Sequence, residues 1–183
     1  MTDIQLPIIN DALKVKAITY SDYYKPLLLK EVEIPIIPNT IVKPTEILVK
    51  VHATSINPVD CVFKGSSYGF INPKSKIIGG DFSGVVVKAG SETKFKIGDK
   101  IFGDVLSLTR RGSSSEFILF EPSNAIICEK IPEGIDFELA ASLPIVSGTA
   151  FQCLKSYKGK TLKGSNVLVL GSGTSVGTYS VQF

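Results

Sequence analysis

The chain has 183 residues, of which 44% are hydrophobic and 20% are charged, a composition typical of a globular protein rather than a disordered one. Its net charge of +3 comes from 20 Lys and Arg residues against 17 Asp and Glu residues, and the basic residues are scattered, which argues against nucleic-acid binding. The sequence contains no secretory signal and no apolar run long enough to span a membrane, so we expect an intracellular, cytoplasmic protein.

The cysteine pattern supports the same compartment. Cys61, Cys128 and Cys153 are odd in number and lie far apart in sequence, which favours reduced thiols over a disulfide framework. We expect each of them to be a buried apolar side chain.

The first two thirds of the chain are predicted to be mainly β. From Leu13 to Phe120, short alternating runs are separated by Pro, Gly and Asn, with strands expected at 47–53, 85–87, 100–102 and 116–120. His52 falls on the more polar face of the first of these strands, where we expect a surface residue. The pattern predicts a small curled β-barrel or a partly open roll, with no helix between Ile47 and Phe120.

The pattern becomes helical after Pro132. Asp136 is placed to cap a helix over 137–141, Pro144 interrupts it, and a second helix is expected over 146–157. The apolar run 167–170 lacks polar alternation and predicts a central parallel strand. The fold class is therefore α/β with a mainly β N-terminal part.

A Gly-rich turn follows the predicted strand and begins a helix. It reads Gly171-Ser-Gly-Thr-Ser-Val-Gly177, and small residues at such a turn let backbone N–H groups approach phosphate oxygens. We predict that it binds a dinucleotide pyrophosphate through Gly171, Ser172, Gly173, Thr174, Ser175, Val176 and Gly177. The alternative is a turn that only connects strand to helix.

The order of several local strings resembles one enzyme superfamily. They are Lys30-Glu-Val-Glu-Ile-Pro35, Glu46 to Asp60, Gly79-Gly-Asp-Phe-Ser-Gly84, Gly98-Asp99, Leu143-Pro144 with Gly148-Thr149-Ala150, and the closing turn with Gln182. Together they are similar to the zinc-independent, quinone-oxidoreductase-like branch of the medium-chain dehydrogenase/reductase superfamily, including its fungal members.

This resemblance implies two domains and no metal. Residues 1–130 would form a GroES-like domain, and residues 131–183 would form connecting helices and the start of a nicotinamide-binding Rossmann domain. Zinc-dependent relatives carry His-Glu where this chain has Gly80-Asp81, and further ligands where it has non-ligands near Asn57 to Asp60. With one His and three dispersed Cys, we expect neither a catalytic nor a structural zinc.

The resemblance also implies site residues. Asn57 and Asp60 belong to a string that lines the cleft near the nicotinamide in relatives, so we assign both a catalytic role and Asn57 a cofactor contact. Read without the family, the same string is a common turn. Thr149 lies where relatives contact the nicotinamide carboxamide, although its hydroxyl could instead bond a helix carbonyl. No proton donor is assigned, because Cys61 stands where relatives often have Tyr and Tyr68 lies in a loop.

The implied reaction is hydride transfer from NADPH or NADH to a quinone, an enone or another activated carbonyl, without zinc. Only six residues follow Gly177, so we expect a chain truncated within the Rossmann domain and inactive alone. The alternative from another class is a non-enzymatic binding or assembly module that pairs through its exposed strand, and a homodimer is compatible with either reading.

Overall fold

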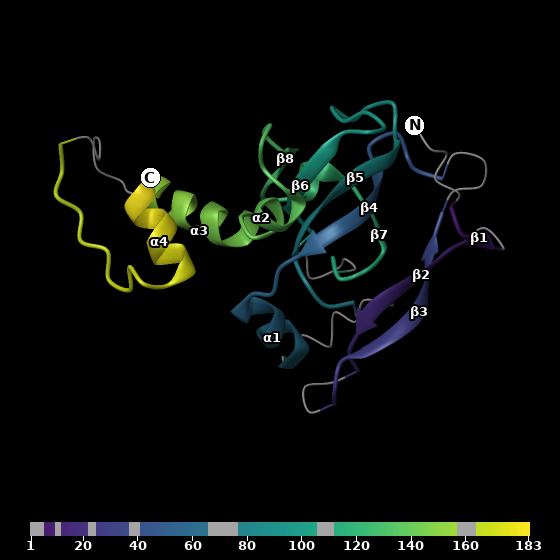
Figure 1. Ribbon diagram of the computed structural model, residues 1–183, viewed down its shortest axis with the longest axis horizontal. Coiled ribbons are helices and arrows are strands. Elements are labelled where there is room, and N and C mark those ends of the chain that lie inside the picture. The colour runs from purple at the N-terminus through teal and green to yellow at the C-terminus, as the bar shows by residue number, and fades with distance from the viewer. Residues whose placement is uncertain are drawn as a thin grey trace.

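The computed structural model describes residues 6–9, 12–21, 25–36, 41–65, 77–105, 112–156 and 164–183. Its described strands form two antiparallel sheets (Figure 1). The smaller sheet has the order β1-β2-β3, with β1 at Ile8–Ile9, β2 at Ala12–Thr19 and β3 at Leu28–Pro35. The larger has the order β7-β4-β5-β6-β8, with strands at Phe117–Phe120, Ile47–Thr54, Asp81–Ala89, Lys100–Asp104 and Cys128–Lys130. All four strands predicted within the β region are confirmed.

Strand β4 is the centre of the β region, because its residues enter two apolar clusters. Ile47 and Val49 pack in a cluster with Phe82, Val86 and other residues of the larger sheet. Leu48 points the other way, into a second cluster that joins β2, β3, β5 and β7. Isolated bridges from Ala17 to Ser115 and from Thr19 to Ile77 connect the end of β2 to this assembly. The alternation predicted for this strand therefore places apolar residues on both faces at its start.

A helix interrupts the β region, and the expectation of none between Ile47 and Phe120 is wrong. Helix α1 spans Pro58–Gly65 and follows directly after β4. Its start has a local cause: proline fits the first helical position, and an acidic residue at the third accepts hydrogen bonds near the helix N-terminus. Asp60 supplies that residue, and its Oδ2 accepts a hydrogen bond from the Asn57 N–H at 2.7 Å.

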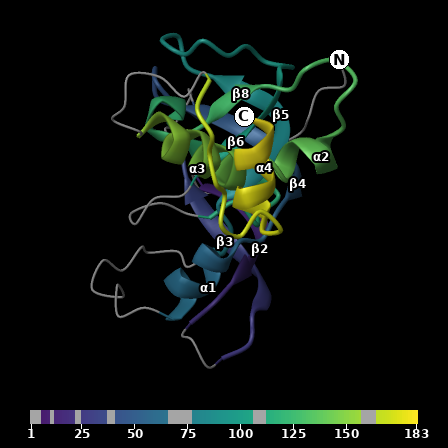
Figure 2. The same cartoon turned by 90° about the vertical axis from the view of Figure 1, so that its left-hand side faces the viewer.

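The helices after β8 agree closely with the sequence. A 3-10 turn at Pro122–Asn124 precedes β8, α2 spans Phe137–Ala141, and α3 spans Pro144–Lys155. Asp136 caps α2 as predicted, with its Oδ1 accepting from the Leu139 N–H at 2.7 Å. Helix α4, Ser175–Gln182, packs beside α3 at the edge of the molecule (Figures 1 and 2). No described helix is long and apolar enough to cross a membrane.

The predicted strand at 167–170 is the main disagreement with the sequence. This segment is irregular, and Val167, Leu168 and Leu170 are 54%, 82% and 87% exposed. A parallel strand forms only when neighbouring strands complete its hydrogen-bond ladder. No described strand pairs with this segment, so its β-branched, apolar composition alone does not produce a strand.

Candidate functional site

The first predicted site lies at the junction of β4 and α1. Asn57 and Asp60 are both buried, at 6% and 3% exposure, although they belong to a polar turn sequence. They are held together by two hydrogen bonds, from the Asn57 N–H to Asp60 Oδ2 at 2.7 Å and from the Asp60 N–H to the Asn57 carbonyl at 3.0 Å. Burial raises the pKa of Asp60, while the hydrogen bond from Asn57 opposes that shift.

Asp81 joins this pair, although sequence reasoning assigned it no role beyond replacing a metal ligand. It is the first residue of β5 and has no solvent exposure. Its Oδ2 accepts hydrogen bonds from Asn57 Nδ2 at 2.7 Å and from the Ser55 hydroxyl at 2.8 Å. Its Oδ1 accepts from the Ile145 N–H in the first turn of α3 at 2.9 Å.

The charge on Asp81 is costly despite these bonds. Burial raises its pKa to about 6, the hydrogen bonds from Asn57, Ser55 and Ile145 act to lower it, and the charge of Asp104 raises it again. Asp104 lies directly opposite Asp81 in the β5–β6 pairing and accepts a hydrogen bond from the Ile127 N–H at 2.8 Å. Asp81 and Asp104 are therefore neighbours on adjacent buried strands.

Tyr20, which the sequence did not single out, interacts electrostatically with this site. Tyr20 is half-buried just after β2, and its pKa is raised by burial and by the negative charge of Asp60. No local pattern reveals this pairing, because 40 positions of sequence separate the two residues. Cys61, which follows Asp60, is exposed, and Tyr68 lies outside the described residues.

The hydroxyl of Thr149 bonds a carbonyl of its own helix, which is the alternative to a cofactor contact that the sequence left open. Its Oγ1 donates to the Ile145 carbonyl of its own helix at 2.6 Å, and the residue is exposed. A threonine hydroxyl can still accept a hydrogen bond while it donates one, so this arrangement leaves an acceptor on the surface of α3.

The Gly-rich turn has the geometry of a helix-start loop. Gly171 has a φ of +84°, and Thr174 caps α4 by accepting a hydrogen bond from the Gly177 N–H at 3.1 Å. A Cβ at position 177 would stand 2.1 Å from the Gly171 carbonyl oxygen, so only glycine allows the helix to approach the turn this closely. Among the described residues, the N–H groups of Ser175 and Val176 have no acceptor.

The Gly-rich turn and helix α1, which follows Asn57, lie toward the same side of the fold. In both ribbon views α1 lies below α4, and α4 begins at its lower end and finishes at the upper one (Figures 1 and 2). The open N–H groups at the start of α4 are therefore at the end of that helix nearer α1.

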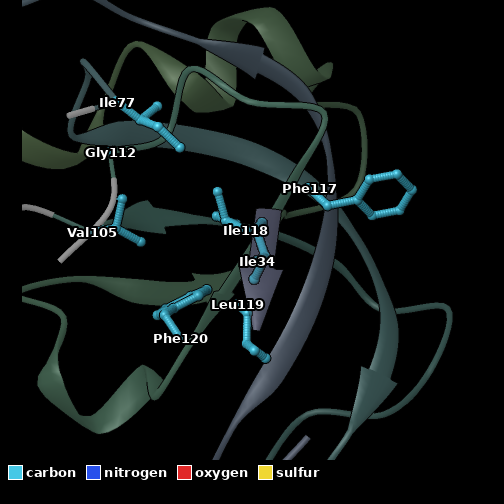
Figure 3. A pocket seen from close by; sticks show the side chains of 8 residues that line it. All are labelled: Ile34, Ile77, Val105, Gly112, Phe117, Ile118, Leu119 and Phe120. Atoms are coloured by element: carbon cyan, nitrogen blue, oxygen red, sulfur yellow. The ribbon is translucent and has the colours of Figure 1, made fainter. Parts of the chain in front are cut away.

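Two hollows in the described part of the structure lie away from these residues. One is an apolar gap of about 10 Å³ between β7 and residues that include Ile34, Ile77 and Val105 (Figure 3). It is too small for a substrate and has the size of a packing defect. The other, about 440 Å³, lies between Ile126–Ile127 and α3, with Phe151 and Phe183 on its wall. Neither is lined by Asn57 or Asp60.

The described residues include few possible metal ligands that lie near one another. Among them, no group of three or more His, Cys, Asp or Glu side chains is placed to hold an ion. His52 is exposed, as predicted, and stacks on Phe137 with ring centroids 4.2 Å apart. The absence of zinc stays a prediction.

Comparisons with known proteins agree with this fold. Residues 43–130 match the alcohol dehydrogenase GroES-like domain. The solved quinone oxidoreductase from Coxiella burnetii superposes with a TM-score of 0.74 at 29% identity, over 92% of this chain and 52% of that one. An alcohol dehydrogenase superfamily protein from Novosphingobium aromaticivorans has a TM-score of 0.76 at 24% identity, over 92% and 49% of the two chains. Residues 43–130 therefore carry the GroES-like domain of alcohol dehydrogenases, and quinone oxidoreductases are among the structural neighbours of the chain.

Among curated proteins, the chain is similar to yeast relatives named without an activity. Protein YIM1-2 of Lachancea thermotolerans is 37% identical over 147 residues, and Protein YIM1 of Vanderwaltozyma polyspora is 37% identical over 171 residues. These matches cover 76% and 88% of this chain but 41% and 47% of those proteins. The chain thus spans about half the length of the curated relatives it matches.

Proposed function

We propose that this chain carries part of the site of an NADPH- or NADH-dependent oxidoreductase that reduces quinones, enones or other activated carbonyl compounds without zinc. The observation that carries the proposal is the Gly-rich turn at the start of α4, where Gly177 lies close to the Gly171 carbonyl and the N–H groups of Ser175 and Val176 have no acceptor among the described residues. Such a group of N–H donors fits a pyrophosphate. The bound nicotinamide would supply the hydride chemistry.

In this proposal, each residue of the site has its own role in binding or positioning the cofactor. The turn from Gly171 to Gly177 would bind the pyrophosphate, with backbone donors and the hydroxyls of Ser172, Thr174 and Ser175. Asn57 and Asp60 would be the catalytic residues on the barrel side, where Asn57 also contacts the cofactor and Asp60 fixes the start of α1. Thr149 would present its open acceptor from α3. We place the boundary between the barrel domain, 1–130, and the nicotinamide-binding part, 131–183, just after β8.

The matched relatives are about twice as long as this chain. In a dinucleotide-binding fold, the adenosine pocket and the acidic partner of the ribose lie on strands beyond the Gly-rich turn. We therefore expect weak cofactor binding and no turnover by these 183 residues alone.

A second candidate function rests on the exposed segment 167–170. Leu168 and Leu170 are 82% and 87% exposed, and a segment with this composition is able to add a strand to another sheet. In this reading, the chain is a non-enzymatic binding or assembly module, including a homodimer.

Calorimetric titration with NADPH and NADH separates the two candidates. We expect little heat from the 183-residue chain and saturable binding by the same chain extended with the second half of a YIM1 relative. Failure of a folded extended chain to bind either cofactor would contradict the oxidoreductase proposal. Micromolar binding by the short chain would show that the cofactor site is completed in another way, for instance by a second chain.

A further inference from the structure

The Asp81 carboxylate connects three segments that are distant in sequence. It lies at the start of β5, receives hydrogen bonds from Ser55 and Asn57 before α1, and receives another from Ile145 in α3. Strand β5 lies between β4 and β6 in the middle of the larger sheet, so the backbone of Asp81 is paired within that sheet (Figure 1).

The bond to Ile145 replaces a missing helix cap. The N-cap position of α3 is Leu143, whose side chain cannot accept a hydrogen bond, and Pro144 follows it. The first free N–H of α3 therefore needs an acceptor from elsewhere, and Asp81 supplies it with a negative charge that also suits the helix N-terminus.

The bond to Asn57 settles the orientation of the Asn57 amide. A carboxylate only accepts hydrogen bonds, so the group turned toward Asp81 must be the amide nitrogen. Oδ1 of Asn57 is then directed away from the carboxylate, and no described residue donates to it. Asn57 thus presents a hydrogen-bond acceptor, which suits a donor such as a carboxamide N–H or a ribose hydroxyl.

We propose that Asp81 is a positioning residue for the cofactor site: it orients the Asn57 amide and holds the start of α3, which carries Thr149. The proposal rests on the function proposed above for Asn57 and Thr149. Its geometric part is testable without cofactor, so a failure of either idea is distinguishable.

Replacing Asp81 with Asn makes a specific prediction. The Ile145 N–H is a fixed donor, so the single amide oxygen of the new side chain must face it, and the new NH₂ group faces Asn57. The Asn57 amide then has to rotate, which turns its Oδ1 inward and its Nδ2 outward. In the double variant Asp81→Asn/Asn57→Asp, the carboxylate at position 57 has two acceptor oxygens. One can accept from the new amide at position 81, and the other is again an outward-facing acceptor.

The first test follows the side-chain amide of Asn57 and the backbone amide of Ile145 by NMR in the full 183-residue chain, between pH 4 and pH 8. We expect both signals to shift with the same midpoint as the Asp81 carboxyl carbon, which titrates near pH 6 because burial raises its pKa to about that value. Amide signals that do not move during this titration would overturn the proposal, and this measurement requires no variant to fold.

The second test measures NADPH binding from NMR shift changes in four proteins, each extended with the second half of a YIM1 relative. We expect about tenfold weaker binding for Asp81→Asn, as for loss of a charge-assisted hydrogen bond, and recovery in Asp81→Asn/Asn57→Asp. Asp99→Asn is the matched control, because Asp99 also accepts a backbone N–H, from Lys96 at 2.8 Å, without contacting Asn57. Equal losses in the single and double variants would overturn the orientation argument. Absence of binding in the wild type would contradict the proposed function and leave the first test to decide.

Discussion

Among the described carboxyl groups whose pKa is shifted, Asp81 has the largest shift, so its ionisation costs the folded state the most free energy. Burial raises its pKa from 3.8 to about 6, so the folded state binds this proton more tightly than the unfolded state. Between about pH 4 and pH 6 the folded protein holds more protons, and its stability therefore falls as the pH rises through this window. Protonation at low pH strengthens the fold at this position.

We expect the free energy of unfolding of the wild type to fall, relative to Asp81→Asn, by up to about 3 kcal/mol between pH 4 and pH 7. Urea unfolding at each pH unit measures this difference. Asp99→Asn gives the opposite sign, with the change mainly at and below about pH 4. Burial is the largest single effect on Asp99 and would raise its pKa, but the hydrogen bonds and charges of Lys130 and Lys96 together outweigh it and lower that pKa. A gap between wild type and Asp81→Asn that does not change with pH would contradict this account.

The three thiols differ in a way that the sequence did not predict. Cys128 is buried and its pKa is raised to about 12 by burial, but Cys61 and Cys153 are exposed, so the expectation of burial is wrong for these two. An aromatic disulfide reagent at pH 8 should label two thiols quickly in the folded protein and the third only after denaturant is added. Cys128→Ala should keep both fast reactions, and rapid labelling of three thiols in the wild type would contradict the described packing.

Single residues were predictable where their role is local. The cap at Asp136 and the exposed His52 follow from helix and strand patterns a few residues long. The buried contacts of Asp81 with Asn57 and Ile145 depend on tertiary packing across 24 and 64 positions, and no local pattern encodes them.

At the scale of elements, the Gly-rich turn and α4 depend on one contact. Gly177→Ala would place a Cβ 2.1 Å from the Gly171 carbonyl oxygen, whereas a Cβ at Gly173 would meet nothing within 4 Å. We expect Gly177→Ala to separate α4 from the turn, with faster hydrogen exchange in α4 and loss of any NADPH binding by the turn. Gly173→Ala is the matched control and should leave exchange in α4 unchanged. Equal behaviour of the two variants would show that the close approach has no role.

The two errors at this scale have different causes. The string Asn-Pro-Val-Asp at 57–60 contains a recognisable helix start, with Pro at the first position and an acidic residue at the third, but we interpreted it as a turn between strands. The segment 167–170 has the composition of a buried strand, and composition cannot report whether partner strands are present. The first error was avoidable from the sequence, and the second was not.

At the scale of the whole molecule, the exposed segment 167–170 should affect association. Leu168 and Leu170 present apolar side chains to solvent beside unpaired backbone groups. We expect sedimentation velocity to detect self-association that rises with protein concentration and decreases in Leu168→Lys/Leu170→Lys. Leu29→Lys, at a residue of β3 that is 70% exposed, is the control at a different sheet. Unchanged association in the double variant would place the contact elsewhere.

The central claim is that Asn57, Thr149 and the turn from Gly171 to Gly177 face one nicotinamide dinucleotide. NMR mapping of shift changes in the 183-residue chain with millimolar NADPH tests it most directly, even if binding is weak. We predict changes at all three places with NADPH, but at the turn alone with adenosine 2′,5′-bisphosphate, which has no nicotinamide. Shift changes confined to other surfaces would contradict the account. So would the absence of any change at saturating NADPH in a folded chain extended by the second half of a relative.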